Sequence, residues 1–122
     1  MEIRKLDLCF SVCKVNDYSQ VNMDAAYIFI GKTEEENSLI CPSDLVPENI
    51  MEREDGWTAF CIQGVLDFSL IGILNGILTV LAQNRIGILA VSTYNTDYIL
   101  VKQENDKKAI EALKKAGYKI IG

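Results

Sequence analysis

The amino-acid sequence predicts an α+β fold, because strand-like and helix-like patterns alternate along the chain. Leu6–Val15 alternates apolar and polar residues, which is the period of a half-buried strand. Between Leu70 and Leu81 the apolar residues recur at helical spacing instead. A second helical pattern, Lys107–Ala116, comes near the C-terminus, so two helices are expected among several strands.

The first strand is expected to be half-buried, with its even-numbered residues Leu6, Leu8, Phe10 and Val12 on one face. Cys9 and Cys13 share the opposite face. The chain has four cysteines and no histidine, and the cysteines lack the spacing of a metal site. We therefore interpret the cysteines as buried, reduced thiols of a cytosolic protein and expect no bound metal.

Two shorter strands and an acidic turn are expected next. Residues 16–23 are mostly polar and predict a loop or one helical turn. Ala25–Gly31 and Ser38–Cys41 are predicted strands. The turn between them carries Glu34–Glu36, a run that favours a solvated turn over a cation site. We interpret residues 42–55, which hold a second acidic run, as the connection to the second half.

The second half repeats strands and helices in a definite order. Its segments are predicted to be strand, helix, strand, strand, helix and strand: Trp57–Gly64, the helix that Asp67 or Ser69 caps, Ile86–Ser92, Tyr98–Lys102, Lys107–Ala116 and Tyr118–Ile121. Asn105 or Asp106 is expected to cap the second helix, and Gly117 to end it. This order is the split βαβ pattern of a ferredoxin-like sheet.

Two glycines inside the first of these helices require an explanation, because each costs about 1 kcal/mol relative to alanine. Such a cost suggests that another part of the chain or a ligand comes close to this helix face. Close packing explains Gly76 best. Gly72 lies near the helix start and is the better candidate for a binding site.

Composition and charge narrow the classes of function. With 122 residues, of which 49% are hydrophobic and 24% charged, the chain is typical of a soluble globular protein. Its net charge of -5 argues against a general nucleic-acid binder, which needs a basic face. The most apolar stretch, Asp67–Ala82, is too short to span a bilayer, and no secretion signal is evident. We therefore expect a cytoplasmic protein without membrane or nucleic-acid partners.

Charge also differs between the two halves of the chain. Residues 1–56 carry twelve acidic and five basic residues, whereas residues 57–122 carry five acidic and seven basic residues. This shift predicts a boundary near Gly56 and two domains, residues 1–55 and 56–122.

Two distant segments of the second half are expected to meet and form a binding site. In the predicted topology, the loop and helix start at residues 67–72 and the hairpin loop Thr93–Asp97 lie at the same end of the sheet. A helix N-terminus favours a carboxylate, and Thr93, Asn95 and Asp97 would add hydroxyl, amide and carboxylate groups. This pairing suits an amino acid. Alternatively, Asp67 and Ser69 only cap the helix and Asp97 only begins a turn.

At these residues the sequence resembles the ACT-domain superfamily, and specifically its CASTOR-type branch. The resemblance is carried by Leu66–Leu74, with Gly72 at the helix start, and by Ile88–Val101, which holds Ser-Thr-Tyr-Asn-Thr-Asp before an aliphatic strand. The first half resembles the degenerate ACT-like repeat that precedes this domain in small bacterial members. Its best match is Ser38–Pro42.

This resemblance implies two ferredoxin-like (βαββαβ, ACT-type) units, of which the N-terminal one is degenerate. It also implies a non-catalytic, ligand-responsive protein that needs no cofactor and pairs its units within the chain or in a homodimer. The ligand contacts carried over from the arginine-sensing relatives are Asp67, Leu70, Ile71, Gly72, Thr93, Tyr94 and Asp97. Leu70 stands where those sensors have an acidic residue, which argues against arginine itself.

Three functions therefore compete. The leading one is a non-catalytic amino-acid sensor or regulatory protein, whose output passes through another protein or through its assembly state. The second is a ligand-free dimerisation or protein-interaction module. The third is an enzyme, which the sequence favours least, because it has neither a histidine to activate a cysteine nor a phosphate-binding loop.

Overall fold

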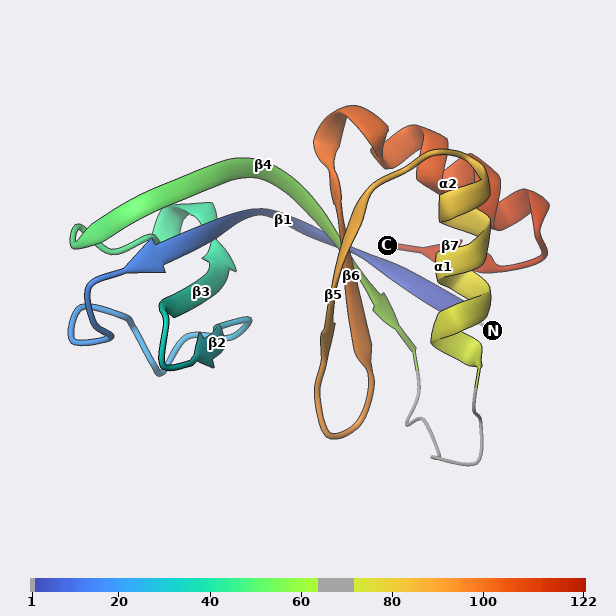
Figure 1. The fold of residues 1–122 in the computed structure, drawn as a ribbon. Helices are drawn as coiled ribbons and strands as arrows, with labels where there is room; N and C mark the ends of the chain where they lie inside the picture. The colour runs from blue at the N-terminus through green and yellow to red at the C-terminus, as the bar shows by residue number, and fades with distance from the viewer. Residues whose placement is uncertain (1, 64–71) are drawn as a thin grey trace. The chain divides into compact units, whose positions relative to one another are not determined.

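The computed structural model describes residues 2–63 and 72–122, and the chain divides into two compact units (Figure 1). Leu8–Trp57 form the first, which we call the inserted unit. Residues 1–7 and 58–122 form the second, which we call the helical unit. Strands β1 (Glu2–Val15) and β4 (Ile50–Ile62) each contribute residues to both units. The first seven residues thus belong with the C-terminal half, an association that the sequence does not reveal.

The helical unit has the predicted order of strands and helices. After β4 come α1 (Ile73–Gln83), β5 (Ile88–Ser92), β6 (Asp97–Lys102), the 3-10 turn η2 (Gln103–Asn105), α2 (Asp106–Lys115) and β7 (Lys119–Ile121). Its strands follow the order β5-β6-β4-β1-β7. This is the ferredoxin-like arrangement with one addition, because the start of β1 lies between β4 and β7 and runs parallel to β7.

The core of the helical unit lies between its sheet and its two helices. The fully or almost fully buried residues are Ile3, Phe60, Ile62, Ile77, Leu81, Ile86, Ile99, Val101, Ala109 and Leu113. Within the predicted apolar stripe of α1, Ile77 and Leu81 are buried, and Leu74 and Leu78 pack against the core at partial burial. Each fully buried side chain of this size contributes about 1.5–3 kcal/mol, so this core dominates the stability of the unit.

Gly76 and Gly117 show why glycine is needed in this unit. A Cβ atom on Gly76 would lie 3.1 Å from the hydroxyl of Tyr118, which agrees with close packing as the reason for this glycine. Gly117 follows α2 with a φ of +102°, so it ends the helix in the left-handed region as predicted. Among the described residues, no helix is long and apolar enough to cross a membrane.

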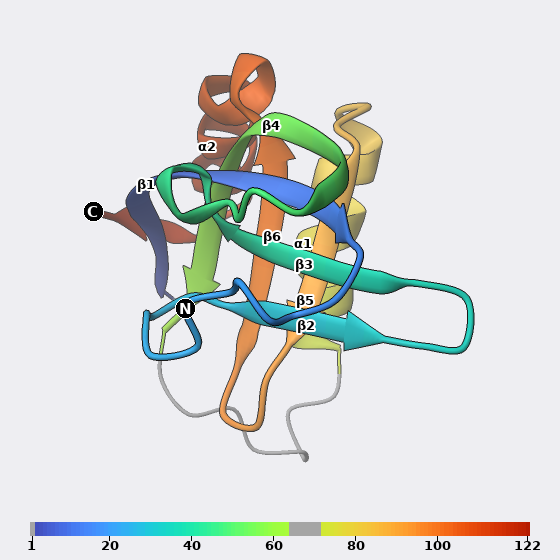
Figure 2. The same cartoon turned by 90° about the vertical axis from the view of Figure 1, so that its left-hand side faces the viewer.

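The inserted unit is built on strands without an α-helix among its residues, all of which are described (Figure 2). Its strand order is β2-β3-β1-β4, where β2 is Phe29–Lys32 and β3 is Asn37–Pro42. β3 pairs antiparallel with both β1 and β2. A 3-10 turn, η1 (Ser43–Leu45), follows β3. The buried core consists of Cys13, Val15, Val21, Leu39 and Cys41.

Beyond Leu6 the burial of the first strand is not confined to one of its two predicted faces, because Phe10 from the face of Leu6 is buried together with Ser11 from the opposite face. Leu8 is 41% exposed, whereas Ser11, Cys13 and Val15 are buried. The change coincides with the passage of β1 from the helical unit into the inserted unit, where Cys13 and Val15 belong to the core. Cys9 is exposed, so three of the four free cysteines are buried as predicted.

Two predicted strand boundaries in the inserted unit also need correction. β4 begins at Ile50, so the acidic run at residues 52–55 lies in a strand and not in a connecting loop. Both faces of the strand are exposed there, and Arg53 pairs with Asp55 at 2.9 Å, so the charges remain solvated. β2 begins at Phe29, because Tyr27 has a φ of 65°, which is incompatible with a strand.

Candidate functional site

The hairpin between β5 and β6 contains the predicted polar loop. Ser92 and Asp97 are paired at the ends of the two strands, and residues 93–96 form the turn. The backbone N–H of Thr93 donates to the carbonyl of Thr96 at 2.8 Å. The Thr93 hydroxyl donates to the same carbonyl at 3.1 Å and accepts from the Thr96 N–H at 3.4 Å. Thr93 therefore closes the turn with both its backbone and its side chain.

One hydrogen bond fixes this turn against the end of β4. The hydroxyl of Thr96 donates to the backbone carbonyl of Ile62, the last residue of β4, at 2.6 Å. The described start of α1 and the hairpin turn lie at the same end of the helical unit (Figure 1). Sequence reasoning missed Thr96, although a second threonine three residues after Thr93 is a signal of such a turn.

Gly72 is the described residue at which helix α1 starts. Its φ is +95°, in the left-handed region that disfavours every other residue type except, in part, asparagine and aspartate. Its carbonyl accepts the first hydrogen bond of the helix from Gly76 at 2.8 Å. The first turn of α1 holds no acidic residue, so its partial positive charge is not offset from within the helix. This end of the helix therefore favours an anionic group.

Three of the predicted contact residues, Asp67, Leu70 and Ile71, lie outside the described residues, as does the predicted cap Ser69. Helix α1 begins later than expected, at Ile73 with Gly72 in the cap position. The second helix also differs in its capping, because Asn105 occupies the cap position without a side-chain hydrogen bond. Asp106, the first residue of α2, instead accepts a hydrogen bond from the buried Thr58 at 3.2 Å.

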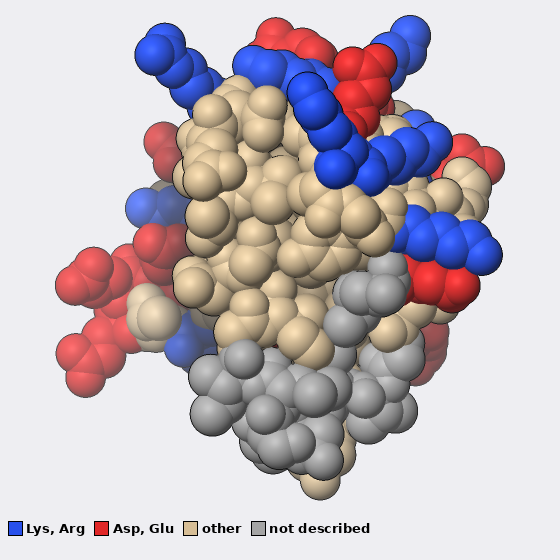
Figure 3. All heavy atoms as spheres, turned by 90° about the vertical axis from the view of Figure 1, so that its right-hand side faces the viewer, with Lys and Arg blue, Asp and Glu red and all other residues tan. Residues whose placement is uncertain are grey.

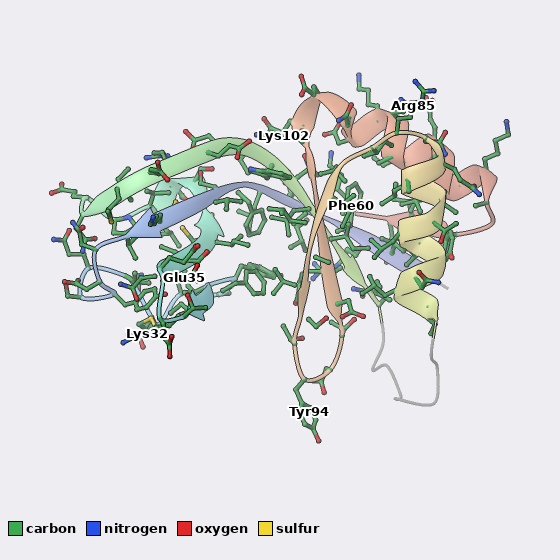
Figure 4. The ribbon with its side chains drawn as sticks, viewed as in Figure 1. Lys32, Glu35, Phe60, Arg85, Tyr94 and Lys102 are labelled. Atoms are coloured by element: carbon green, nitrogen blue, oxygen red, sulfur yellow. The ribbon has the colours of Figure 1, made fainter. Side chains whose placement is uncertain are left out.

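The remaining predicted contact residues differ in how free their side chains are. Asp97 accepts a hydrogen bond from the hydroxyl of Ser92, and Thr93 is engaged within the turn. Tyr94 is 91% exposed and points away from the tip of the hairpin (Figure 4). At this end of the helical unit the structure therefore brings together a left-handed glycine, a helix start, one carboxylate and one exposed aromatic ring.

A second polar cluster lies in the inserted unit. Ser11, which is fully buried, is hydrogen-bonded to Ser43 at 2.7 Å and donates to the carboxylate of Asp55. Asp55 also accepts from Arg53 at 3.0 and 2.9 Å, and this contact raises the pKa of the Arg53 guanidinium. These hydrogen bonds pair the polar groups of the cluster with one another, and they link β1 to β4 and to the η1 turn.

The buried thiols beside this cluster are not activated. Burial raises the pKa of Cys41 to about 12, and burial also raises the pKa of Cys13. The thiolate is the nucleophilic form of cysteine, so both thiols are protonated and unreactive at neutral pH.

Comparison with known proteins identifies the family. Residues 52–115, which are more than half of the chain, match the family model described as ACT domain. The chain belongs to the ACT-domain family. No curated protein matches its sequence significantly.

Solved structures resemble this ACT-domain chain over almost its whole length. A protein of Agobacterium tumefaciens, whose structure was determined by X-ray crystallography, is 25% identical with a TM-score of 0.87, over 98% of this chain and 91% of that one. The regulatory subunit of aspartate kinase from Thermus thermophilus is 12% identical with a TM-score of 0.64, over 94% and 96%. Aspartate kinase from Clostridium acetobutylicum is 14% identical with a TM-score of 0.65, over 93% of this chain and 33% of the kinase. The two kinase comparisons show a shared fold.

Proposed function

We propose that this ACT-domain protein is a non-catalytic regulatory or sensor protein that binds a small molecule of the amino-acid class. The ligand is held in the helical unit, between the start of α1 and the β5–β6 turn. The single observation that carries this proposal is the hydrogen bond from Thr96 to Ile62 at 2.6 Å, because it holds the turn at the end of the sheet from which the chain continues to α1.

The chemistry of this end suits a zwitterion. The first turn of α1 favours a carboxylate, and Asp97 supplies a carboxylate for the ammonium group. Tyr94 supplies an exposed ring that can cover a bound side chain. Asp67, Leu70, Ile71 and Gly72 complete the proposed contact set, together with Thr93.

Names of similar structures agree with a regulatory role of this kind. The Clostridium acetobutylicum kinase is described as an allosteric enzyme, and the Thermus thermophilus chain as a regulatory subunit. Aspartokinase III of Escherichia coli, 13% identical with a TM-score of 0.62, was solved with aspartate and ADP. We extend these properties to the present chain as a proposal, together with a cytoplasmic location, a homodimer, a regulated partner protein and membership of the CASTOR-type branch.

We also propose that the inserted unit is the degenerate half of a tandem ACT pair. Its strand order, β2-β3-β1-β4, places the first strand between the third and the fourth, as in a ferredoxin-like sheet. Its β3 and η1 lie sixty positions before β6 and η2, at residues 37–42 and 43–45 against 97–102 and 103–105. The two helices of a complete unit are absent from it.

A ligand-free dimerisation or interaction module is the alternative, and two observations favour it. Thr93 and Asp97 already use their polar groups within the hairpin. Helix α1 carries no charged residue, and no acidic or basic side chain covers the centre of the face over it (Figure 3). Two copies could meet there without repulsion between like charges.

Thermal unfolding in the presence of each of the twenty amino acids and of nucleotides tests the proposal. A ligand that binds only the folded state stabilises it by about 2.7 kcal/mol at a hundred times its dissociation constant, which raises the midpoint. We expect a shift with one or two amino acids. Asp97→Ala should abolish it, whereas Glu34→Ala, which removes a carboxylate from the other hairpin turn, should retain it.

A shift that both variants retain would place the ligand elsewhere in the chain. No shift with any compound, from a protein that sediments as a stable dimer, would favour the interaction module.

A further inference from the structure

The two units carry charge of opposite sign. The inserted unit has ten acidic and three basic residues, whereas the helical unit has seven acidic and nine basic residues. Their net charges are therefore -7 and +2, which add up to the -5 of the whole chain. In each unit much of this charge is concentrated in one short exposed segment.

In the helical unit the basic segment is the outer face of α2. Lys107, Lys108, Lys114 and Lys115 are all exposed, and we call them, together with Glu111, the lysine face. Ala109 and Leu113, on the opposite side of the helix, are buried in the core. Lys and Arg side chains accordingly gather at the top of the molecule over α2 (Figure 3).

The lysine face has a net charge of +3 that is not neutralised within the helix. Glu111 is its one acidic residue, and no ion pair is formed by the four lysines among the described residues. Asp106, the other acidic residue of α2, is turned to Thr58 at 3.2 Å and lies 3.9 Å from the ammonium of Lys5. Its charge is therefore partly offset inside the unit.

In the inserted unit the acidic segment is the β2–β3 turn, Glu34–Glu36, which we call the acidic turn. All three glutamates are exposed, and with Gly31, Thr33 and Ser38 they line a shallow depression. Thr33 holds the turn, because its N–H donates to the Glu36 carbonyl at 3.0 Å and its hydroxyl accepts from the N–H groups of Glu35 and Glu36. Three carboxylates are thus presented from a fixed backbone (Figure 4, where Glu35 is labelled).

We propose that the lysine face of one copy of the chain binds the acidic turn of a second copy. The charges match in number, +3 against -3, and both segments are exposed and held by ordered backbone. A polyanion such as nucleic acid is a poorer occupant of the lysine face, because the chain as a whole carries -5 and repels it.

This contact has two physical consequences. Its two surfaces differ, so a first contact leaves one lysine face and one acidic turn that can pair with each other or with further copies. The assembly closes as a dimer where both pairings form between the same two copies, and otherwise it continues into a ring or a filament. The attraction is between solvent-exposed charges, so it acts over about 30 Å at about 0.01 M salt and over only about 3 Å at about 1 M.

Sedimentation velocity of the full chain tests the proposal. At low salt we expect species larger than the basal one, in proportions that rise with protein concentration, and at high salt a return to the basal species. Lys107→Glu with Lys108→Glu should remove the larger species, and Glu34→Lys with Glu35→Lys should do the same. Glu111→Lys should strengthen the association, because it raises the net charge of the lysine face.

The decisive measurement mixes the two charge-reversed proteins. Neither associates alone, but each offers a surface of opposite charge to the other, so the larger species should return in the mixture. The control is Asp24→Lys with Glu48→Lys, which changes the net charge equally at exposed acids outside the acidic turn. Circular dichroism establishes that each variant is folded.

Three results would overturn the proposal: no larger species at low salt in the wild-type protein, loss of association in the control pair, or no recovery on mixing. None of them bears on the amino-acid site, since ligand binding is measured separately by the thermal shift.

Discussion

The hairpins β2–β3 and β5–β6 have the same backbone hydrogen bond in their turns, but the side chains of the two turns differ. In each, a threonine opens the turn and bonds to the residue three positions later, at Thr33–Glu36 and at Thr93–Thr96. A 3-10 turn follows each hairpin. Only the second 3-10 turn is followed by a helix. The amphipathic segment of α2 comes directly after η2, whereas β4 begins five residues after Leu45, the end of η1.

The comparison teaches that the threonine sets the turn and leaves the intervening side chains free for other tasks. Those side chains are Glu34, Glu35 and Glu36 in the inserted unit, and Tyr94, Asn95 and Thr96 in the helical unit. Thr96 uses its hydroxyl to anchor the turn on β4, and Glu36 at the corresponding position is exposed. The proposed ligand site thus uses one hairpin, and the proposed self-association uses the other.

The largest expected effect comes from truncating matched core residues. Ile99 and Leu39 occupy the same position of β6 and β3 and are 1% and 0% exposed. Each change to alanine should cost about 2–5 kcal/mol in the free energy of unfolding. Ile99→Ala should cost more, because Ile99 belongs to the larger core under both helices.

Urea denaturation measures both values. A loss below about 1 kcal/mol for Leu39→Ala would show that the inserted unit adds little to the folded chain.

Gly72 and Gly87 give the next largest contrast. Gly72→Ala should destabilise the protein by about 1–2 kcal/mol, because the Cβ atom of alanine makes the left-handed backbone conformation unfavourable. A Cβ atom at Gly87 would meet nothing within 4 Å, so Gly87→Ala should be neutral or slightly stabilising. Thermal unfolding of both variants distinguishes them, and equal losses would contradict the assigned backbone strain.

A smaller effect is expected at the anchor of the turn. Thr96→Val removes the hydrogen bond to the Ile62 carbonyl and should cost about 0.5–1.5 kcal/mol. It should also reduce any amino-acid shift by releasing the turn from β4. Glu36→Val, the matched change in the other hairpin, should leave that shift intact. An unchanged shift in Thr96→Val would separate the turn from the site.

The smallest expected effect is absent at neutral pH and arises only in alkaline solution, from a buried thiol of the inserted unit. Cys41 has a pKa of about 12 when folded, against an ordinary value of 9.0. The thiol therefore ionises first in the unfolded chain, and the free energy of unfolding should fall as the pH rises from 9.0 towards about 12. Cys41→Ala should flatten this part of the pH profile, and a profile identical to that of the wild type would contradict the assignment.

The sequence by itself determined the local structure of the helical unit. Helical spacing predicted α1 and α2, Gly117 predicted the end of α2, and the polar residues 93–97 predicted the hairpin turn. From the order of these elements the ferredoxin-like sheet followed, and so did the placement of this turn at the same end of the sheet as the helix start. The helices, the helix end and the turn depend on neighbours within a few residues, which a periodic pattern records directly.

Only the tertiary structure decided the rest. The placement of residues 2–4 beside β7, the burial of residues from both faces of β1, and the strand formed by the acidic residues 52–55 all depend on partners far away in sequence. The same is true of Thr96, whose role is visible only once Ile62 is beside it. A pattern of apolar residues specifies which side chains can be buried, but the pairing of distant strands decides which face is covered.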